Sequence, residues 1–232
     1  MRLDKLLANK AFGSRKEVHQ IIKDRRVTVN DIIVVKKDHP INIDTDTIAV
    51  DGSQISTKQL YYIKFHKPAG YITAVEDRLH PVVMDLLPPE FKKMGVFPVG
   101  RLDKDTEGLL LLTNDGVWAH SIINGHKHVP KVYYVEFHGI LSKEGLERIS
   151  AGIVLGDGIQ CKPATINILS DKSLEITLEE GKYHQVKRMI GAAGGEVTYL
   201  KRLSVGHITL SGIEETNTYL EIGDQEIADF KK

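Results

Sequence analysis

A run of four leucines followed by a threonine, at residues 109–113, constrains the fold of this chain more than any other segment. An uninterrupted apolar run of this length predicts a β-strand that is buried on both faces, because a strand with one wet face alternates apolar and polar residues. Asn114-Asp115-Gly116 then predicts a turn, and residues 117–123 predict a helix. We therefore expect a sheet that is covered on both sides at this point.

From residue 60 onward the sequence predicts many strands and few helices. Residues 61–65 alternate in the manner of a strand, and Lys67-Pro68-Ala69-Gly70 ends it. Apolar residues spaced i, i+3, i+4 and i+7 from Val186 predict a helix over residues 184–193 that ends at Gly194-Gly195. Further strands are expected at residues 132–137, 164–169, 174–178, 197–203 and 208–210. The fold class is α+β.

The first 60 residues have a different pattern. Leu3, Leu6 and Leu7 have helical spacing, and Gly13 ends this first helix. Ser14 and Glu17 predict a capping box at the start of a second helix. Short strands are expected at residues 27–29, 32–35 and 46–50, and the polar residues 53–59 are expected to form a linker.

Charge is unevenly distributed along the chain. The 232 residues have a formal net charge of zero, but residues 1–30 contain eight Lys/Arg against three acids, a net charge of +5. Attraction to phosphate decays within about 8–10 Å, so a local excess of charge matters more than the total. This basic segment indicates a nucleic-acid partner; a solvated charged face on a small helix pair is the other interpretation.

Composition excludes several classes of protein. No apolar run approaches the roughly 18 residues that span a bilayer, and the N-terminus resembles neither a signal peptide nor a transit peptide. The single cysteine, Cys161, cannot form an internal disulfide, which fits a reducing cytosol. No base neighbours Cys161 in the sequence, so we expect a structural thiol rather than a reactive one.

The segment Gly100–Gly108 is the strongest candidate for chemistry. It places Arg101, Asp103, Lys104, Asp105 and Glu107 between two glycines, immediately before the buried strand. Carboxylates beside an apolar sheet are desolvated, so nearby basic side chains are needed to offset the energetic cost of their charge. Either a reactive site or a salt-bridged turn would satisfy this pattern.

Motifs for metals and cofactors are missing from the sequence. His126 and His128 form the only close histidine pair, with no Cys or acid at ligand spacing. Neither phosphate-binding glycine fingerprint is present, nor a Gly-x-Ser-x-Gly elbow. We therefore expect no metal and, if the chain is an enzyme, a reaction without a cofactor.

The N-terminal part resembles the S4 domain, an RNA-binding module named after a ribosomal protein. The resemblance is carried by residues 2–7 (RLDKLL), 14–16 (SRK) and 27–30 (VTVN). It implies that the basic second helix and the loop after it bind structured RNA, which proteins read through shape and phosphates. The residues that it implies are Arg2, Arg15, Lys16, Lys23, Arg25 and Arg26.

The sequence Gly-Arg-Leu-Asp at residues 100–103 resembles the signature of RNA pseudouridine synthases. The match runs from Pro98 to Gly116 and is similar to the RsuA-like branch, typified by a bacterial small-subunit rRNA enzyme; residues 67–70, 131–133 and 180–189 match further blocks. The resemblance implies an S4 domain at residues 1–55 and a catalytic domain at residues 60–232. The latter would have a mixed, mainly antiparallel sheet flanked by helices, with a central cleft.

The same resemblance assigns roles to individual residues. Asp103 corresponds to the catalytic carboxylate, Tyr133 to the tyrosine that stacks near the target base, and Arg101 and Lys187 to supporting residues. Many relatives have Arg in place of Lys187, so this chain keeps the charge but loses the guanidinium fork. On the expected helix Lys187 lies about 110° and Arg188 about 150° from the centre of the apolar face, so Lys187 flanks the core and Arg188 points outward. Two more RNA contacts are expected, Lys182 and Arg188.

The implied activity is the isomerisation of a specific uridine to pseudouridine in small-subunit (16S) rRNA, or in a partly assembled small-subunit particle. Two alternatives stay open: the same chemistry on large-subunit (23S) rRNA, and a non-catalytic S4-type factor for ribosome assembly. We expect a cytoplasmic monomer with no membrane and no obligate protein partner.

Overall fold

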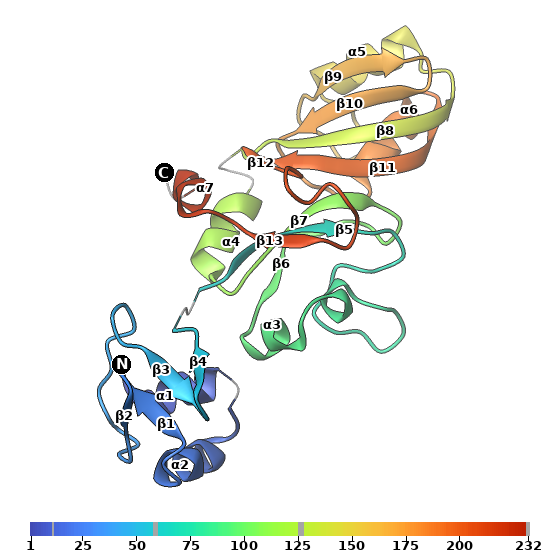
Figure 1. The fold of residues 1–232 in the computed structure, drawn as a ribbon. Helices are drawn as coiled ribbons and strands as arrows, with labels where there is room; N and C mark the ends of the chain where they lie inside the picture. The colour runs from blue at the N-terminus through green and yellow to red at the C-terminus, as the bar shows by residue number, and fades with distance from the viewer. Residues whose placement is uncertain (11, 58–59, 125–127, 231–232) are drawn as a thin grey trace. The chain divides into compact units, whose positions relative to one another are not determined.

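The computed structural model describes residues 1–10, 12–57, 60–124 and 128–230, and it divides the chain into two compact units (Figure 1). The first unit contains Met1–Tyr61 and Leu87–Val96, and the second contains Tyr62–Leu86 and Phe97–Lys232. A short segment from the middle of the chain thus belongs with the N-terminal unit. The expected boundaries at residues 55 and 60 stay a prediction. Among the described residues, no helix has the length and apolar character needed to cross a membrane.

The first unit packs helices against a small antiparallel sheet. Helices α1 (Leu3–Asn9) and α2 (Arg15–Lys23) bury Leu3, Leu6 and Leu7 together with strand residues. The predicted capping box is confirmed, since Glu17 N–H donates to Ser14 Oγ and Ser14 N–H donates to the Glu17 carboxylate. Helix α3 (Pro89–Lys93) also lies in this unit. The strand order is β2 (Ile32–Ile33), β1 (Val27–Val29), β3 (Ile48–Val50), β4 (Ser53–Ile55).

The expected linker at residues 53–59 was wrong in its first half. Residues Ser53–Ile55 form β4, which pairs antiparallel with β3 through a tight turn. Asp51 and Gly52 both have positive φ, 51° and 78°. An Asp-Gly pair favours this conformation and is a strong hairpin signal, which the polar composition of the segment obscured.

The second unit is built on a nine-stranded mixed sheet, and its mainly antiparallel character confirms the expected fold class. The order of the main path is β13-β5-β7-β11-β8-β10-β9, with β12 paired to β11 and β6 paired to β7. The pair of β7 and β11 is parallel and the others are antiparallel. The strands are β5 (Tyr62–Lys67), β6 (Phe97–Val99), β7 (Glu107–Thr113), β8 (Lys131–Gly139), β9 (Thr165–Ser170), β10 (Ser173–Leu178), β11 (Gly195–Val205), β12 (Ile208–Thr209) and β13 (Tyr219–Glu221).

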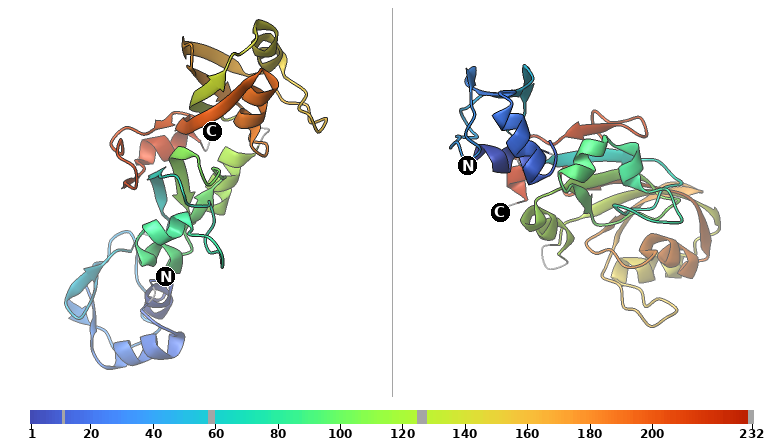
Figure 2. Two further views of the ribbon diagram at one scale, coloured as in Figure 1. Left: turned by 90° about the vertical axis from the view of Figure 1, so that its right-hand side faces the viewer. Right: turned by 90° about the horizontal axis from the view of Figure 1, so that it is seen from below.

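The leucine run forms a buried strand of this sheet, as the sequence predicted. Leu109–Leu112 are buried in β7, which has β5 along one edge and both β6 and β11 along the other. The helical elements of this unit are η1 (Val83–Leu86), α4 (Gly116–Ile123), α5 (Lys143–Ala151), α6 (Gln185–Ala192) and α7 (Asp224–Asp229). Helices α5 and α6 lie at the same end of this unit, and the residue before α5 contacts the residue after α6: Ser142 N–H donates to Ala193 O at 3.0 Å (Figure 2).

Candidate active site

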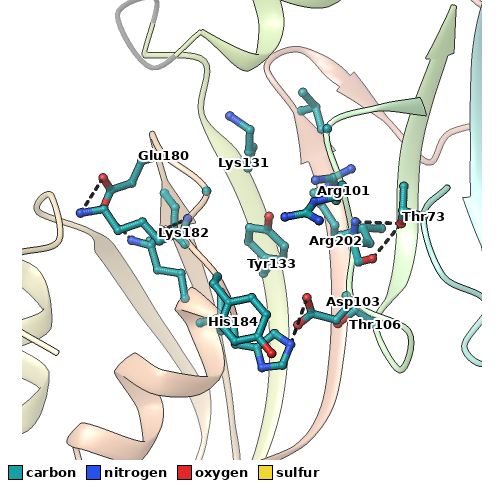
Figure 3. Close-up of a pocket in the computed structure, with 18 of the residues that line it drawn as sticks. Thr73, Arg101, Asp103, Thr106, Lys131, Tyr133, Glu180, Lys182, His184 and Arg202 are labelled. Atoms are coloured by element: carbon teal, nitrogen blue, oxygen red, sulfur yellow. Dashed lines mark hydrogen bonds and ion pairs between the residues drawn. The ribbon is translucent and has the colours of Figure 1, made fainter. Parts of the chain in front are cut away.

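A cavity of about 620 Å³ opens in the second unit beside the central strands. Its lining comes from residues 72–74, the segment before β7, the end of α4, strands β8 and β11, and the loop between β10 and α6 (Figure 3). Segments far apart in the sequence thus meet around one space. The predicted residues Arg101, Asp103, Tyr133 and Lys182 all line it.

The segment before β7 is fixed by hydrogen bonds on both sides of Asp103. Thr73 Oγ1 donates to Leu102 O at 2.7 Å and accepts from Leu102 N–H at 3.0 Å. The ammonium of Lys67, which is fully buried, donates to the carbonyls of Pro68, Lys104 and Thr106. Burial lowers the pKa of Lys67 to about 8. The backbone around Asp103 is therefore held in place by a buried cation.

The carboxylate of Asp103 faces two basic side chains. Lys187 Nζ lies 3.4 Å from Asp103 Oδ2, and His184 Nε2 lies 3.6 Å from Asp103 Oδ1. Lys187 also approaches Asp105 Oδ1, at 2.5 Å. Burial would raise the pKa of Asp105, but the hydrogen bond and the charge of Lys187 outweigh it, so this pKa lies below its usual value. One ammonium thus bridges two carboxylates of the same loop.

The two adjacent basic residues of helix α6, Lys187 and Arg188, have different partners. The sequence predicted that Lys187 flanks the core, and Lys187 reaches Asp103. Arg188 was expected to point outward, but both side chains are 24% exposed. The guanidinium of Arg188 pairs with Asp157 and donates to Tyr183 O at 3.3 Å. The expected RNA contact of Arg188 stays a prediction, now for a side chain that already has partners.

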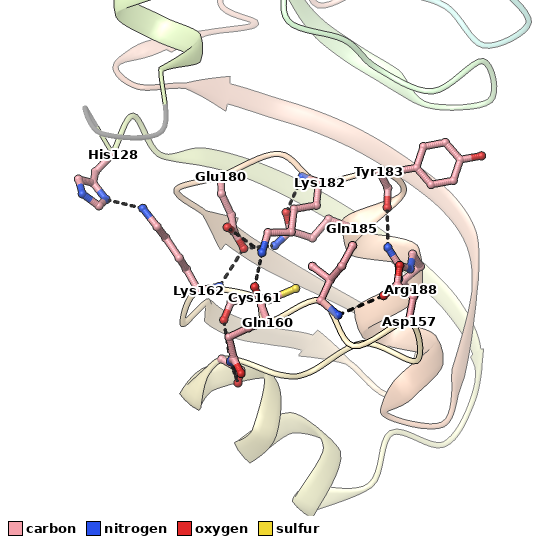
Figure 4. Close-up of polar contacts among 12 residues, drawn as sticks. His128, Asp157, Gln160, Cys161, Lys162, Glu180, Lys182, Tyr183, Gln185 and Arg188 are labelled. Carbon is pink, nitrogen blue, oxygen red and sulfur yellow. Dashed lines mark hydrogen bonds and ion pairs between the residues drawn. The ribbon is translucent and has the colours of Figure 1, made fainter.

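The loop between β10 and α6 is held by a network of side chains (Figure 4). Gln185, which is buried, donates from Nε2 to Glu180 Oε1 at 2.7 Å and accepts from Lys182 N–H at 2.8 Å. Lys182 Nζ donates to Gln160 O and lies 3.5 Å from Glu180 Oε2. The network fixes the segment that presents His184 to the cavity. Cys161 lies nearby, and burial raises the pKa of its thiol, as suits the structural role expected for it.

The strands β8 and β11 supply the floor of the cavity. Tyr133 is buried and lies opposite Arg202 in the pairing of these strands. Burial lowers the pKa of Lys131, also in the lining, to about 8. Arg202 is 3% exposed and donates from Nε to Leu109 O at 2.7 Å; its Nη2 has no hydrogen-bond partner among the residues that the structure describes.

The sequence assigned no role to several lining or supporting residues, among them Lys67, Lys131, His184 and Arg202. Lys67, Lys131 and His184 lie in blocks of sequence that match the family, but the match did not indicate what these three residues do. For Arg202 no motif gave a signal; its position follows from strand pairing. Arg101 is exposed at the rim.

The basic residues of the first unit are not part of this cavity. All six predicted RNA contacts there are exposed. Arg2 pairs with Asp4 and Arg26 pairs with Asp51, each at 2.6 Å. In the predicted histidine pair, His126 lies outside the described residues, and His128 Nδ1 lies 2.9 Å from Glu179 Oε2.

Comparisons with known proteins agree on one family. Residues 61–192 match the family described as RNA pseudouridylate synthase, and residues 1–45 match the S4 domain. An uncharacterized RNA pseudouridine synthase of Bacillus subtilis, YtzG, is 41% identical over 98% of this chain and 97% of that protein. The ribosomal small subunit pseudouridine synthase A of Vibrio cholerae is 36% identical over the full length of both chains. The crystal structure of a pseudouridylate synthase has a TM-score of 0.68 at 31% identity and covers 99% of each chain.

The fold, the cavity and these matches define an RNA-modifying isomerase that carries its own RNA-binding domain. The chain belongs to the RNA pseudouridine synthase family, among relatives of the RsuA type.

Proposed function

We propose that this protein isomerises one uridine of small-subunit rRNA and that the carboxylate of Asp103 is the reacting group. One observation carries the proposal: Asp103 lines a cavity of about 620 Å³ and faces Lys187 and His184 at 3.4 and 3.6 Å. Full-length relatives named ribosomal small subunit pseudouridine synthase A, at 34–36% identity, support the choice of RNA.

The chemistry of the isomerisation suits this arrangement. The bond between N1 and C1′ breaks, C5 bonds to C1′, and the proton of C5 is replaced by one on N1, so no oxidant, reductant or water is consumed. An ionised carboxylate can attack the sugar or the base, or can remove a sugar proton. The ammonium of Lys187 lies 3.4 Å from Asp103 Oδ2, beside the carboxylate that we propose reacts. We therefore propose a reaction without a metal or a cofactor.

The uridine must leave its stack to reach Asp103. Extrusion of a base costs a few kcal/mol, and stacking on an aromatic ring offsets part of that cost. Tyr133 lines the same cavity as Asp103 and supplies such a ring. We propose that Tyr133 holds the extruded base and that the S4 domain, with its basic residues, holds the surrounding RNA.

The two alternatives have different tests. A non-catalytic assembly factor would have no need for Asp103 and Tyr133 in one cavity with Lys187 beside Asp103, which disfavours that interpretation. Large-subunit rRNA as the target needs an experiment. We propose mapping pseudouridines in both rRNAs from cells with and without this protein; loss of one small-subunit pseudouridine is expected. Loss of a large-subunit pseudouridine instead would contradict the choice of RNA and leave the proposed reaction unaffected.

We further propose that the enzyme acts in the cytoplasm as a monomer.

A further inference from the structure

Tyr183 and His184 form a stacked aromatic pair at the rim of the cavity. Their ring centroids are 3.9 Å apart and the rings are 16° from parallel. Tyr183 is 71% exposed, although both residues line the cavity that contains Asp103. Figure 4 shows its ring directed away from the polar network around it. An apolar ring is thus presented to solvent at the entrance to the candidate active site.

Hydrogen bonds hold the loop that carries the pair. Arg188 Nη1 donates to Tyr183 O, and Gln185 ties the same loop to Glu180 and Lys182. His184 has a left-handed backbone, with φ 48° and ψ 35°, and its Nε2 lies 3.6 Å from Asp103 Oδ1. A side chain that is already ordered loses little further conformational entropy when a ligand binds. The geometry therefore suits a preformed contact.

We infer that Tyr183, backed by His184, is a stacking platform for the nucleobase next to the target uridine in single-stranded RNA. The inference rests on the proposed function. Extrusion of the uridine leaves its neighbour without a stacking partner, and an exposed ring at the rim replaces that partner. Because His184 also faces Asp103, the platform fixes the neighbouring base relative to the carboxylate. Tyr183 is thus a positioning residue that helps select which uridine enters.

The first test uses a small-subunit rRNA transcript whose modified uridine has been mapped. An abasic ribose is placed on the 5′ or the 3′ side of that uridine. Stacking on one base is worth about 1–3 kcal/mol, so KM should rise about 5- to 150-fold for one of the two transcripts while kcat changes little. Tyr183→Leu should show the raised KM with intact RNA and no further rise with the abasic one. Tyr183→Phe should behave as the wild type.

Two outcomes would overturn the platform. One is a Tyr183→Leu variant with wild-type KM, and the other is an abasic penalty that is as large in the variant as in the wild type. Tyr219→Leu is the matched control, since Tyr219 is a half-exposed tyrosine on β13 outside the cavity lining.

A second measurement separates the platform from the proposed function. The probe is a pentamer RNA of four uridines around a central 2-aminopurine, whose fluorescence falls on stacking. The wild type and Tyr219→Leu should quench it, and Tyr183→Leu should bind it about ten-fold more weakly. Equal binding and quenching by all three proteins would refute the platform. If no rRNA uridine is modified but the pentamer response depends on Tyr183, the proposed function fails and the platform stands.

Discussion

Asp103 and Asp105 lie two residues apart, and both carboxylates pair with Lys187. We nevertheless expect substitutions at the two positions to affect activity differently. Asp103→Asn keeps the shape of the side chain but removes its charge and its nucleophilic oxygen. We expect pseudouridine formation to fall to background while RNA affinity stays within about three-fold, because binding energy is spread over many contacts. The measurement is pseudouridine formed in rRNA after single-turnover incubation.

Asp105→Asn is not a neutral control for this experiment, because it removes a hydrogen bond that holds Lys187. Asp171→Asn is better matched, since Asp171 lies exposed in the turn between β9 and β10, away from the cavity lining. It should keep wild-type activity. An Asp103→Asn protein as active as the Asp171→Asn protein would refute the catalytic role.

Lys67 gives the stability of the protein a pH dependence. Burial lowers its pKa from 10.5 to about 8, so between these values the unfolded chain binds more protons than the folded protein. The free energy of unfolding contributed by Lys67 is therefore lowest below pH 8 and rises as the pH increases through this window. The rise should be on the order of 2–3 kcal/mol, from about 1.4 kcal/mol per pKa unit.

Urea unfolding of the wild type and Lys67→Met, from about pH 7.5 to about pH 10, checks this. The variant should lack the rise that the wild type shows. Lys131, whose pKa is also lowered to about 8, is present in both proteins, so its contribution cancels in the difference. Parallel curves for the two proteins would show that Lys67 is not the cause.

The sequence predicted individual residues of the site but not which residues lie next to them in space. Asp103, Tyr133 and Lys187 stand in recognisable local motifs, and the structure brings them around one cavity or its edge. Lys67 and Arg202 depend on the pairing of distant strands, because both lie opposite Gly108 of β7. Pairing between strands so far apart in sequence leaves no local pattern to read.

At the scale of elements, strong periodicity was a reliable guide. The run in β7 and the apolar stripe of α6 were predicted to within two residues of their bounds. Helix α5 was missed because its stripe is thin: within Lys143–Ala151 the buried residues are Gly145 and Ile149. Its end signals were nevertheless present, since Ser142 caps its start and Gly152, with φ 96°, follows its last residue. Caps alone did not outweigh a weak apolar pattern.

The contact between β7 and β11 depends on a glycine. A Cβ on Gly108 would lie 2.2 Å from Arg202 O, and the φ of Gly108 is 106°. We expect Gly108→Ala to destabilise the protein by more than about 2 kcal/mol, because it combines backbone strain with a clash against main chain. The midpoint of urea unfolding measures this, with pseudouridine formation as a second readout.

Gly116→Ala is the matched control. Gly116 begins α4, has no positive φ, and a Cβ there would meet nothing within 4 Å. This substitution should be neutral or stabilise the protein by up to about 1 kcal/mol. A Gly108→Ala protein as stable as the Gly116→Ala protein would mean that β7 and β11 can separate without cost.

For the whole molecule, the distribution of charge matters more than the net charge of zero. In the first unit Arg2 and Arg26 are already paired with carboxylates, whereas Arg15, Lys16, Lys23 and Arg25 are exposed basic residues on or just after α2. The four residues named last are the better test of an RNA-binding face.

Changing these four residues to Ala should weaken binding to rRNA and flatten its dependence on salt. Each lost phosphate contact should reduce the slope of log K against log salt by about 0.7–0.9. The check is a binding titration across salt concentrations, with Lys143→Ala as the control on the exposed face of α5. Unchanged affinity and slope would show that α2 does not contact the RNA.

The single parallel pair of the large sheet also determines when the enzyme becomes complete during synthesis. Strand β11 inserts between β7 and β8, which precede it in the chain by about 90 and 60 residues. Until the ribosome has released β11, β8 lacks its neighbour on that side and β7 lacks its partner at Glu107 and Gly108, and unpaired strand edges promote aggregation. The two walls of the cavity are then separate half-sheets. A chain cut short before Gly195 would therefore hold Asp103 and Tyr133 on half-sheets that no strand pairing joins, and it would be a target for chaperones rather than a slower enzyme.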